Sequence, residues 1–347
     1  MKHEIDLKNY EIHTDLALEK IENEKDGYQV EEKKIENVSI TKVVIQKDGS
    51  KKLRKKVGTY ITIEFEDVSD HENRELVTNI FQKELLSMME QLSIKKDASC
   101  LVIGLGNEKS TPDALGPITL SKILVTNHLF QLGEVEEGVR PVSLFLPGVT
   151  GETGLETSEL VGSVISMAKP DFVIVIDALA SKSIERVGHT IQITDTGIHP
   201  GSGIGNERKE ISQELYHIPV ISIGIPTVVD AVTIVSDTIG YMYKHFSYTK
   251  EHLNDPSSKF VVGINYLKEE IKEETDQKQK WFGMIGSLNE EEIRNLIFEV
   301  LSPIGFNLMV TPKEINFMIE ELGSVLGRGI NEALQSYSPL FKESDTF

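Results

Sequence analysis

Four short apolar runs, each ended by Gly, Pro or Asp, constrain the fold of this chain more than any other feature. They cover residues 99–104, 142–146, 172–176 and 220–225. Apolar runs of this length without polar alternation are typical of buried parallel strands. Residues 115–130 and 156–168 have helical spacing and separate the first three runs. This β-α-β alternation predicts an α/β fold with a mainly parallel sheet sandwiched by helices.

The flanks of this core, which spans about 98–240, predict an N-terminal β-hairpin extension and a helical C-terminal part. Residues 40–46 and 60–65 favour two strands, and Lys47-Asp48-Gly49-Ser50 favours the turn. The basic run 51–56 between them fits a solvated hairpin edge. Other expectations concern longer stretches of the chain. They are a polar, helix-prone periphery at 1–35, a helix from about 70, an irregular Gly-rich loop at 188–210, a helix opening at 228–232, a charged, mobile stretch at 250–282 and helices over about 288–340.

Composition excludes several classes of protein. The 347 residues carry a net charge of -19, which argues against nonspecific binding to nucleic acid or to anionic membranes. The single cysteine, Cys100, excludes an internal disulfide and fits a reducing cytosol. The first residues lack the apolar segment of a secretory signal, and no apolar stretch reaches the length of a transmembrane helix. We therefore expect a cytoplasmic protein without a membrane partner.

Two aspartates stand just past two of the apolar runs. Asp113 follows the turn Gly104-Leu105-Gly106, and Asp177 directly follows the run 172–176. In open parallel sheets, chemistry takes place beyond the carboxyl ends of the strands. Two carboxylates delivered there could act as general acid and general base. Each could equally cap the segment that follows it, so the residues alone leave both interpretations open.

Three further motifs have competing interpretations. Gly104-Leu105-Gly106 lacks the third glycine of a dinucleotide-binding fingerprint, since Lys109 takes its place, so a tight turn that directs the loop of Asp113 is favoured. Asp195-Thr196-Gly197 copies the triplet of pepsin-like proteases, but one copy in an α/β context does not predict that fold. His199 could complete a metal site with the two aspartates, or could be an ordinary loop histidine.

Five motifs, in this order along the chain, resemble the germination proteases of spore-forming Firmicutes. They are Gly104-Leu105-Gly106-Asn107, Thr111-Pro112-Asp113-Ala114-Leu115-Gly116-Pro117, Pro147-Gly148-Val149-Thr150-Gly151, Val175-Ile176-Asp177-Ala178-Leu179-Ala180 and Thr194-Asp195-Thr196-Gly197-Ile198-His199-Pro200-Gly201-Ser202-Gly203. The resemblance implies an atypical aspartic endopeptidase with a fold similar to that of hydrogenase-maturation endopeptidases. It implies that Asp113 and Asp177 are the catalytic carboxylates. We expect no cofactor. It further implies a homotetramer in the forespore or spore core that degrades small acid-soluble, DNA-coating proteins.

The resemblance also implies a zymogen that removes its own propeptide. Substrates of the family carry an acidic residue before the cut bond, then an aliphatic or aromatic residue, a small residue and, two further on, Glu. Thr14-Asp15-Leu16-Ala17-Leu18-Glu19 resembles this pattern, although Leu18 stands where Ser is usual. The cut would fall between Asp15 and Leu16, leaving a propeptide of residues 1–15 and a single α/β peptidase domain of residues 16–347. The same hexapeptide also fits a capped helix start.

Two other functions are compatible with the residues. The first is a metal-assisted hydrolase that uses Asp113, Asp177 and possibly His199. The second is a non-enzymatic α/β binding protein in which both aspartates serve only as caps. Chelation would separate the first from an aspartic endopeptidase, and replacement of the two aspartates would separate the second.

Overall fold

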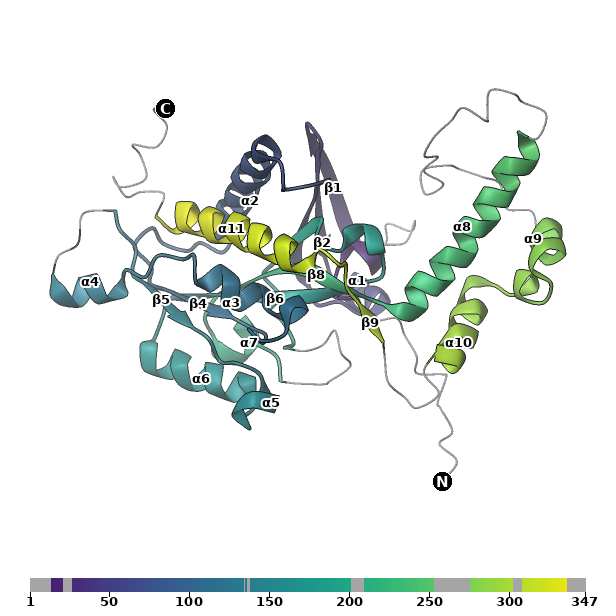
Figure 1. Cartoon of the computed structure of the whole chain (residues 1–347). Coiled ribbons are helices and arrows are strands. Elements are labelled where there is room, and N and C mark those ends of the chain that lie inside the picture. Colours follow the sequence, from purple (N-terminus) through teal and green to yellow (C-terminus); the bar gives the residue numbers. More distant parts are fainter. Residues whose placement is uncertain are drawn as a thin grey trace. The chain divides into compact units, whose positions relative to one another are not determined.

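One mixed β-sheet organises the chain (Figure 1). The computed structural model describes residues 14–20, 27–133, 135, 138–200, 209–252, 275–301 and 308–335. The strands are β1 (Tyr28–Ile35), β2 (Val38–Ile45), β3 (Gly58–Glu64), β4 (Cys100–Gly104), β5 (Val142–Phe145), β6 (Phe172–Ser181), β7 (Thr190–Thr194), β8 (Val220–Asp230) and β9 (Met309–Val310). Their order in the sheet is β1-β2-β3-β7-β8-β6-β4-β5, and β9 pairs with the end of β8.

Helices cover both faces of the central strands. The helices are α1 (Lys47–Leu53), α2 (His71–Gln91), α3 (Leu115–Leu120), α4 (Asn127–Leu132), α5 (Thr150–Thr153), α6 (Thr157–Ala168), α7 (Gln213–Tyr216), α8 (Ala231–Glu251), α9 (Thr275–Phe282), α10 (Glu290–Leu301) and α11 (Ile315–Leu334). Figure 1 shows α2 and α11 on one side of the sheet and α6 on the other. Val102 and Ile174 pack in the core cluster with α2, α3 and α11, whereas Leu101 and Val173 pack with α6. Alternate residues of one strand therefore fill two cores, as an apolar run without polar alternation predicts.

The α/β fold expected from the sequence is confirmed, with a mixed sheet around a parallel centre. Strand β4 pairs in parallel with β5 and with β6, where Gly104 lies opposite Ile176. The strands β1, β2, β3, β7 and β8 pair antiparallel in succession. The predicted hairpin is thus β2 and β3, and it continues the same sheet through β7.

Several local predictions were wrong. Residues 28–35 were expected to belong to a polar, helix-prone periphery, but they form the strand β1, in which five of the eight residues are exposed. The turn expected at 47–50 is the start of α1, and the helix expected over 115–130 is two short helices, α3 and α4. The stretch 188–210 contains β7 before its loop, and β6 continues past Asp177 to Ser181. Much of the stretch expected to be mobile, residues 253–274, lies outside the described residues.

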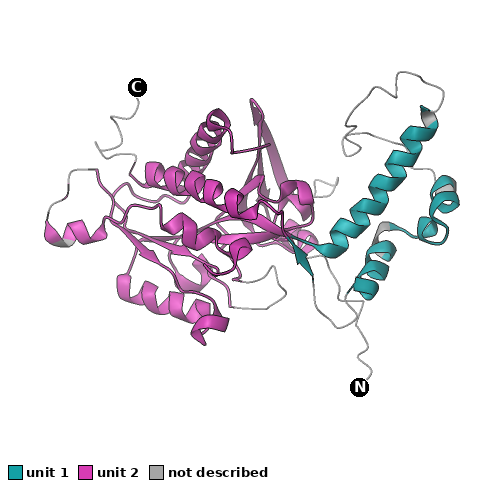
Figure 2. Cartoon of the chain, viewed as in Figure 1, with its two compact units in different colours: residues 1–12, 229–310 teal, residues 13–228, 311–347 magenta. Residues whose placement is uncertain are grey.

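The chain divides into two compact units (Figure 2). One consists of residues 1–12 and 229–310, and in it α8 packs against α10 through Val232, Ile297 and Phe298. The other consists of residues 13–228 and 311–347 and contains both aspartates discussed above. Compactness does not decide whether the units fold separately, so the single peptidase domain expected for residues 16–347 stays a prediction.

Candidate active site

Asp113 is held against the turn that follows β4. It ends a single 3₁₀ turn, Thr111–Asp113, and its carbonyl accepts a hydrogen bond of 3.0 Å from the amide of Asn107. Gly106 has φ +109°, and a Cβ at this position would overlap the backbone oxygen of Asp113. A glycine is therefore required for the aspartate to approach so closely. The tight turn predicted from Gly104-Leu105-Gly106 places Asp113 at the end of β4.

Asp177 lies at the same end of the neighbouring strand. The amide of Leu105 donates a hydrogen bond of 2.8 Å to the carbonyl of Ile176, which extends the pairing of β4 with β6 up to Asp177. The Asp177 side chain is 6% exposed, and one carboxylate oxygen accepts a hydrogen bond of 2.9 Å from the Ala178 amide. The turn that carries Asp113 contacts β6. The fold thus brings both predicted aspartates to one end of adjacent parallel strands.

The segment Thr14–Lys20 is bound a few residues further along β6. Asp15 donates its amide to the carbonyl of Ala180 at 3.1 Å, and its carboxylate accepts the Ala180 amide at 2.9 Å. The side-chain amide of Gln192, on β7, donates to the Asp15 carbonyl at 3.2 Å and accepts the Ala17 amide at 2.8 Å. Leu16 is fully buried. The segment predicted to contain the cleavage site therefore lies on the strand that carries Asp177.

The side chain of Glu19, near the C-terminal end of this segment, is bound in a polar corner. Its carboxylate accepts hydrogen bonds from the Ser181 hydroxyl at 2.7 Å and from the Lys182 amide at 2.7 Å. It also forms an ion pair with Arg186 at 3.1 Å, and its side chain is only 3% exposed. Burial lowers the pKa of Arg186, but the carboxylates of Glu64 and Glu19 outweigh burial and leave this pKa raised. The almost completely buried Glu19 carboxylate is therefore satisfied by hydrogen-bonded and ion-paired partners.

Lys55 contacts two backbone carbonyls on the N-terminal side of the predicted cleavage bond. Its ammonium donates to the carbonyl of Asp15 at 2.8 Å and to that of Thr14 at 3.2 Å. Burial lowers the Lys55 pKa to about 8, although Asp15 opposes the shift. The basic run 51–56 was expected at a solvated hairpin edge, and for Lys55 this was wrong. Lys55, Gln192 and Arg186 were missed because no local pattern marks residues that converge only in the fold.

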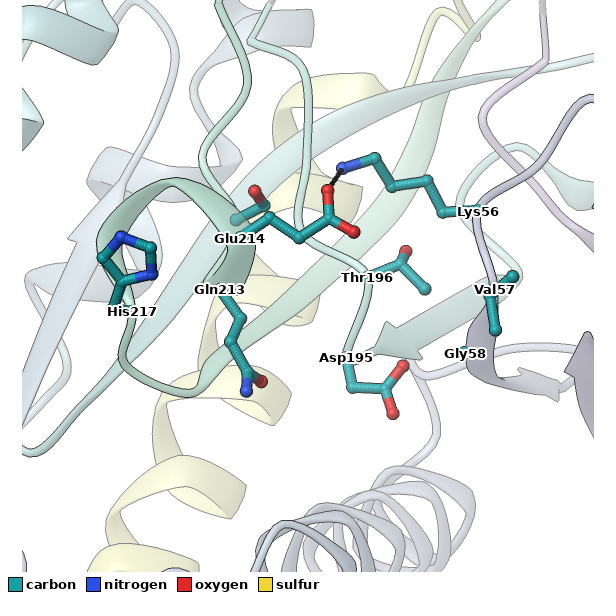
Figure 3. Close-up of a pocket in the computed structure, with 9 residues that line it drawn as sticks. Lys56, Val57, Gly58, Asp195, Thr196, Gln213, Glu214 and His217 are labelled. Atoms are coloured by element: carbon teal, nitrogen blue, oxygen red, sulfur yellow. Dashed lines mark hydrogen bonds and ion pairs between the residues drawn. The ribbon is translucent and has the colours of Figure 1, made fainter. Parts of the chain in front are cut away.

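A separate cavity of about 530 Å³ lies at the ends of β3 and β7 (Figure 3). Lys56, Gly58, Asp195 and Glu214 are among its lining residues. The Asp195 carboxylate accepts the Thr59 amide at 2.8 Å, and burial raises its pKa. The carboxylate also accepts the side-chain amide of Gln91 at 3.5 Å, so its described contacts join the end of β7 to β3 and to the end of α2. The resemblance of Asp195-Thr196-Gly197 to the pepsin triplet thus corresponds to a strand-joining contact in this fold.

The described residues do not assemble the metal site considered from the sequence. Within them, no group of three or more His, Cys, Asp or Glu side chains is placed to hold a metal ion. His199 is half exposed, and its Nε2 lies 3.4 Å from a carboxylate oxygen of Glu210.

Burial raises the pKa of the Cys100 thiol, as expected of a structural cysteine and not of a nucleophile. Nor does any helix in the described ranges have the length and apolar character to cross a membrane.

Comparison with known proteins identifies the class. The family model described as Germination protease matches residues 5–339. A germination protease of Geobacillus sp. is 48% identical, and those of Bacillus mycoides and Bacillus cereus are each 49% identical. In all three cases the alignment covers 96% of this chain and 96% of the relative. The chain is accordingly a protease. It belongs to the germination protease family, as its five motifs indicated.

One solved structure has a limited similarity. A nickel–iron hydrogenase maturation protease from Thermococcus kodakarensis matches 40% of this chain and 80% of its own, with 17% identity and a TM-score of 0.26. A score this low carries no argument about the site. The α/β architecture rests on the sheet and helices described above.

Proposed function

We propose that this protein is an endopeptidase made as a self-processing zymogen, in which Asp113 and Asp177 act as general acid and general base. The observation that carries the proposal is the binding of Thr14–Lys20 to β6, the strand that also carries Asp177. A protease that holds its own predicted cleavage segment beside a candidate catalytic strand is suited to cut itself. Its substrates in the cell are the small acid-soluble proteins that coat spore DNA, and it works as a homotetramer in the forespore and spore core.

The chemistry requires two carboxylates in different protonation states. The ionised carboxylate takes a proton from water as the water attacks the peptide carbonyl. The protonated one hydrogen-bonds to that carbonyl and then transfers its proton to the leaving nitrogen. The common location of Asp113 and Asp177 at the ends of β4 and β6 supports this assignment.

The zymogen form has a physical rationale. A protease active while the DNA coat is assembled would destroy that coat too early. The bound Thr14–Lys20 segment buries Leu16 and Ala17 completely or nearly so, and it engages both Gln192 and Arg186. Cutting after Asp15 frees one end of this segment, which favours its release and opens the binding surface.

Mass spectrometry of the purified full-length chain, held at mildly acidic pH, tests the proposal. We expect a product that begins at Leu16, while the Asp113→Asn and Asp177→Asn proteins stay full length. Leu16→Pro should also block the cut, since proline removes the amide N–H and fixes φ at the bond to be broken. A mature N-terminus elsewhere, or equal trimming of the aspartate variants in a protease-free preparation, would refute self-processing.

A further inference from the structure

The surface that holds Thr14–Lys20 has the properties of a peptide-binding site. Its backbone contacts come from Ala180 at the end of β6 and from the side-chain amide of Gln192. Gln192 forms hydrogen bonds with one carbonyl and one amide of the bound segment, so it holds the main chain of the segment regardless of the segment's side chains. Main-chain hydrogen bonds of this kind give affinity for extended peptides, and pockets for side chains give specificity.

The pocket with the strongest chemical preference is the corner around Glu19. Ser181, the Lys182 amide and Arg186 all direct donors at one carboxylate that is almost completely removed from water. The Nε of Arg186 donates to Glu64 at 2.9 Å, which leaves its Nη1 for Glu19. Glu64 therefore orients the guanidinium and remains as its partner when the bound segment leaves. An amide side chain in this corner would bring an N–H toward donors and lose the ion pair.

Ala17 adds a size restriction two residues before Glu19. It is 1% exposed and belongs to a cluster with Tyr28, Val43 and Tyr60. A larger side chain would have to displace these neighbours, at the cost typical of overpacking. The surface thus selects a small residue at the second position after the predicted cleavage bond, and a carboxylate at the fourth.

We propose that Ser181, Lys182 and Arg186 form the specificity site of the endopeptidase, which reads an acidic side chain at the fourth position after the bond that is cut. The proposal rests on the proposed function. Glu19 occupies this site before self-processing, and the corresponding carboxylate of a substrate peptide occupies it once the segment is released. Arg186 supplies the charge, and Glu64 is its positioning residue.

Peptide cleavage by the full chain tests this assignment. One peptide copies residues 10–24, and a second carries Gln in place of Glu19. Wild-type protein should prefer the Glu peptide in kcat/KM by roughly 10- to 100-fold, the range expected for a charge-assisted hydrogen bond. Arg186→Gln should reduce this preference to about threefold or less, whereas Arg328→Gln, which removes an exposed ion-paired arginine, should keep it.

The test compares the kcat/KM values of the two peptides as a ratio, so its result does not depend on the fraction of protein that is folded. A lower fraction of folded enzyme, or weaker competition by the protein's own segment, changes both rates equally. If Arg186→Gln cleaves too slowly to measure, Ser181→Ala should lower the preference severalfold. Equal cleavage of both peptides by wild-type protein, or a full preference retained in the Arg186 or Ser181 variant, overturns the specificity site alone. Failure of the wild-type protein to cut either peptide between Asp15 and Leu16 overturns the proposed function with it.

Discussion

Replacing Glu19 by Gln should loosen the bound segment, because the carboxylate holds it through three groups of the fold. The partners are the Ser181 hydroxyl, the Lys182 amide and the Arg186 guanidinium, and the Glu19 side chain is 3% exposed. Hydrogen bonds to a charged group contribute about 1.5–3 kcal/mol, and removing one member of a buried pair costs about 3–5 kcal/mol. Arg186 keeps Glu64 as a partner, so the lower range applies. We expect a loss of roughly 2–3 kcal/mol in the free energy of segment binding.

Hydrogen exchange measures this loss directly. The amides of Asp15, Leu16 and Ala17 all donate hydrogen bonds in the bound segment. A loss of roughly 2–3 kcal/mol raises the population of the released segment about 30- to 150-fold, since about 1.4 kcal/mol corresponds to a factor of ten. Exchange of a peptide covering residues 14–20 should accelerate by that factor, measured in an Asp177→Asn background to prevent cutting.

The control and the contradicting result are both defined by the structure. Glu332→Gln removes a surface contact with Arg328 on α11, and it should leave exchange of the segment unchanged. Amides of β4, in the core, should exchange at the same rate in every variant. If the exchange rate of the 14–20 peptide in the Glu19→Gln protein is within about threefold of the rate in the protein that keeps Glu19, the argument that the carboxylate contacts hold the segment is refuted.

Two further predictions concern a lysine and a glycine near the site. Burial lowers the Lys55 pKa to about 8 from 10.5, so between these pH values the unfolded chain binds a proton that the folded chain does not. Urea titrations should therefore show that the free energy of unfolding of the wild-type protein rises, relative to that of Lys55→Met, by roughly 2–3 kcal/mol from below pH 8 to above pH 10. A difference between the two proteins that does not change with pH would contradict the lowered Lys55 pKa. Gly106→Ala should destabilise the protein by several times the roughly 1 kcal/mol expected for Gly154→Ala, since both have positive φ but only Gly106 meets a neighbour, Asp113. Equal unfolding midpoints for the two variants would contradict this account of the turn.

The sequence was sufficient for those features that depend on local pattern. Residues 100–103 of β4 and 172–176 of β6 are apolar at every position because both faces of these strands are covered, and such runs can be recognised without knowledge of the fold. Gly104-Leu105-Gly106 predicted the turn that brings Asp113 to the end of β4. The positions of Asp113 and Asp177 followed from the rule that parallel strands end at a common edge.

Features that depend on distant contacts could not be predicted in this way. Strand β1 lies at the edge of the sheet, where polar residues replace the apolar pattern of a buried strand. Arg186 and Gln192 acquire their significance only because Thr14–Lys20 folds back against residues more than 160 positions later. Lys55 was assigned to solvent because a basic run is usually exposed, and only its contacts to two carbonyls reveal another environment.

The most direct test of the central claim is the rate of peptide cleavage by Asp113→Asn and Asp177→Asn proteins whose fold is verified by circular dichroism. Asn preserves the shape of the side chain but cannot exchange a proton, so each variant should lose roughly 10²- to 10⁴-fold in kcat. Asp195→Asn is the matched control, because an amide oxygen can still accept the Thr59 amide, and it should keep most of the activity. Near-normal cleavage by either the Asp113 or the Asp177 variant would contradict the assignment of the two aspartates as general acid and base.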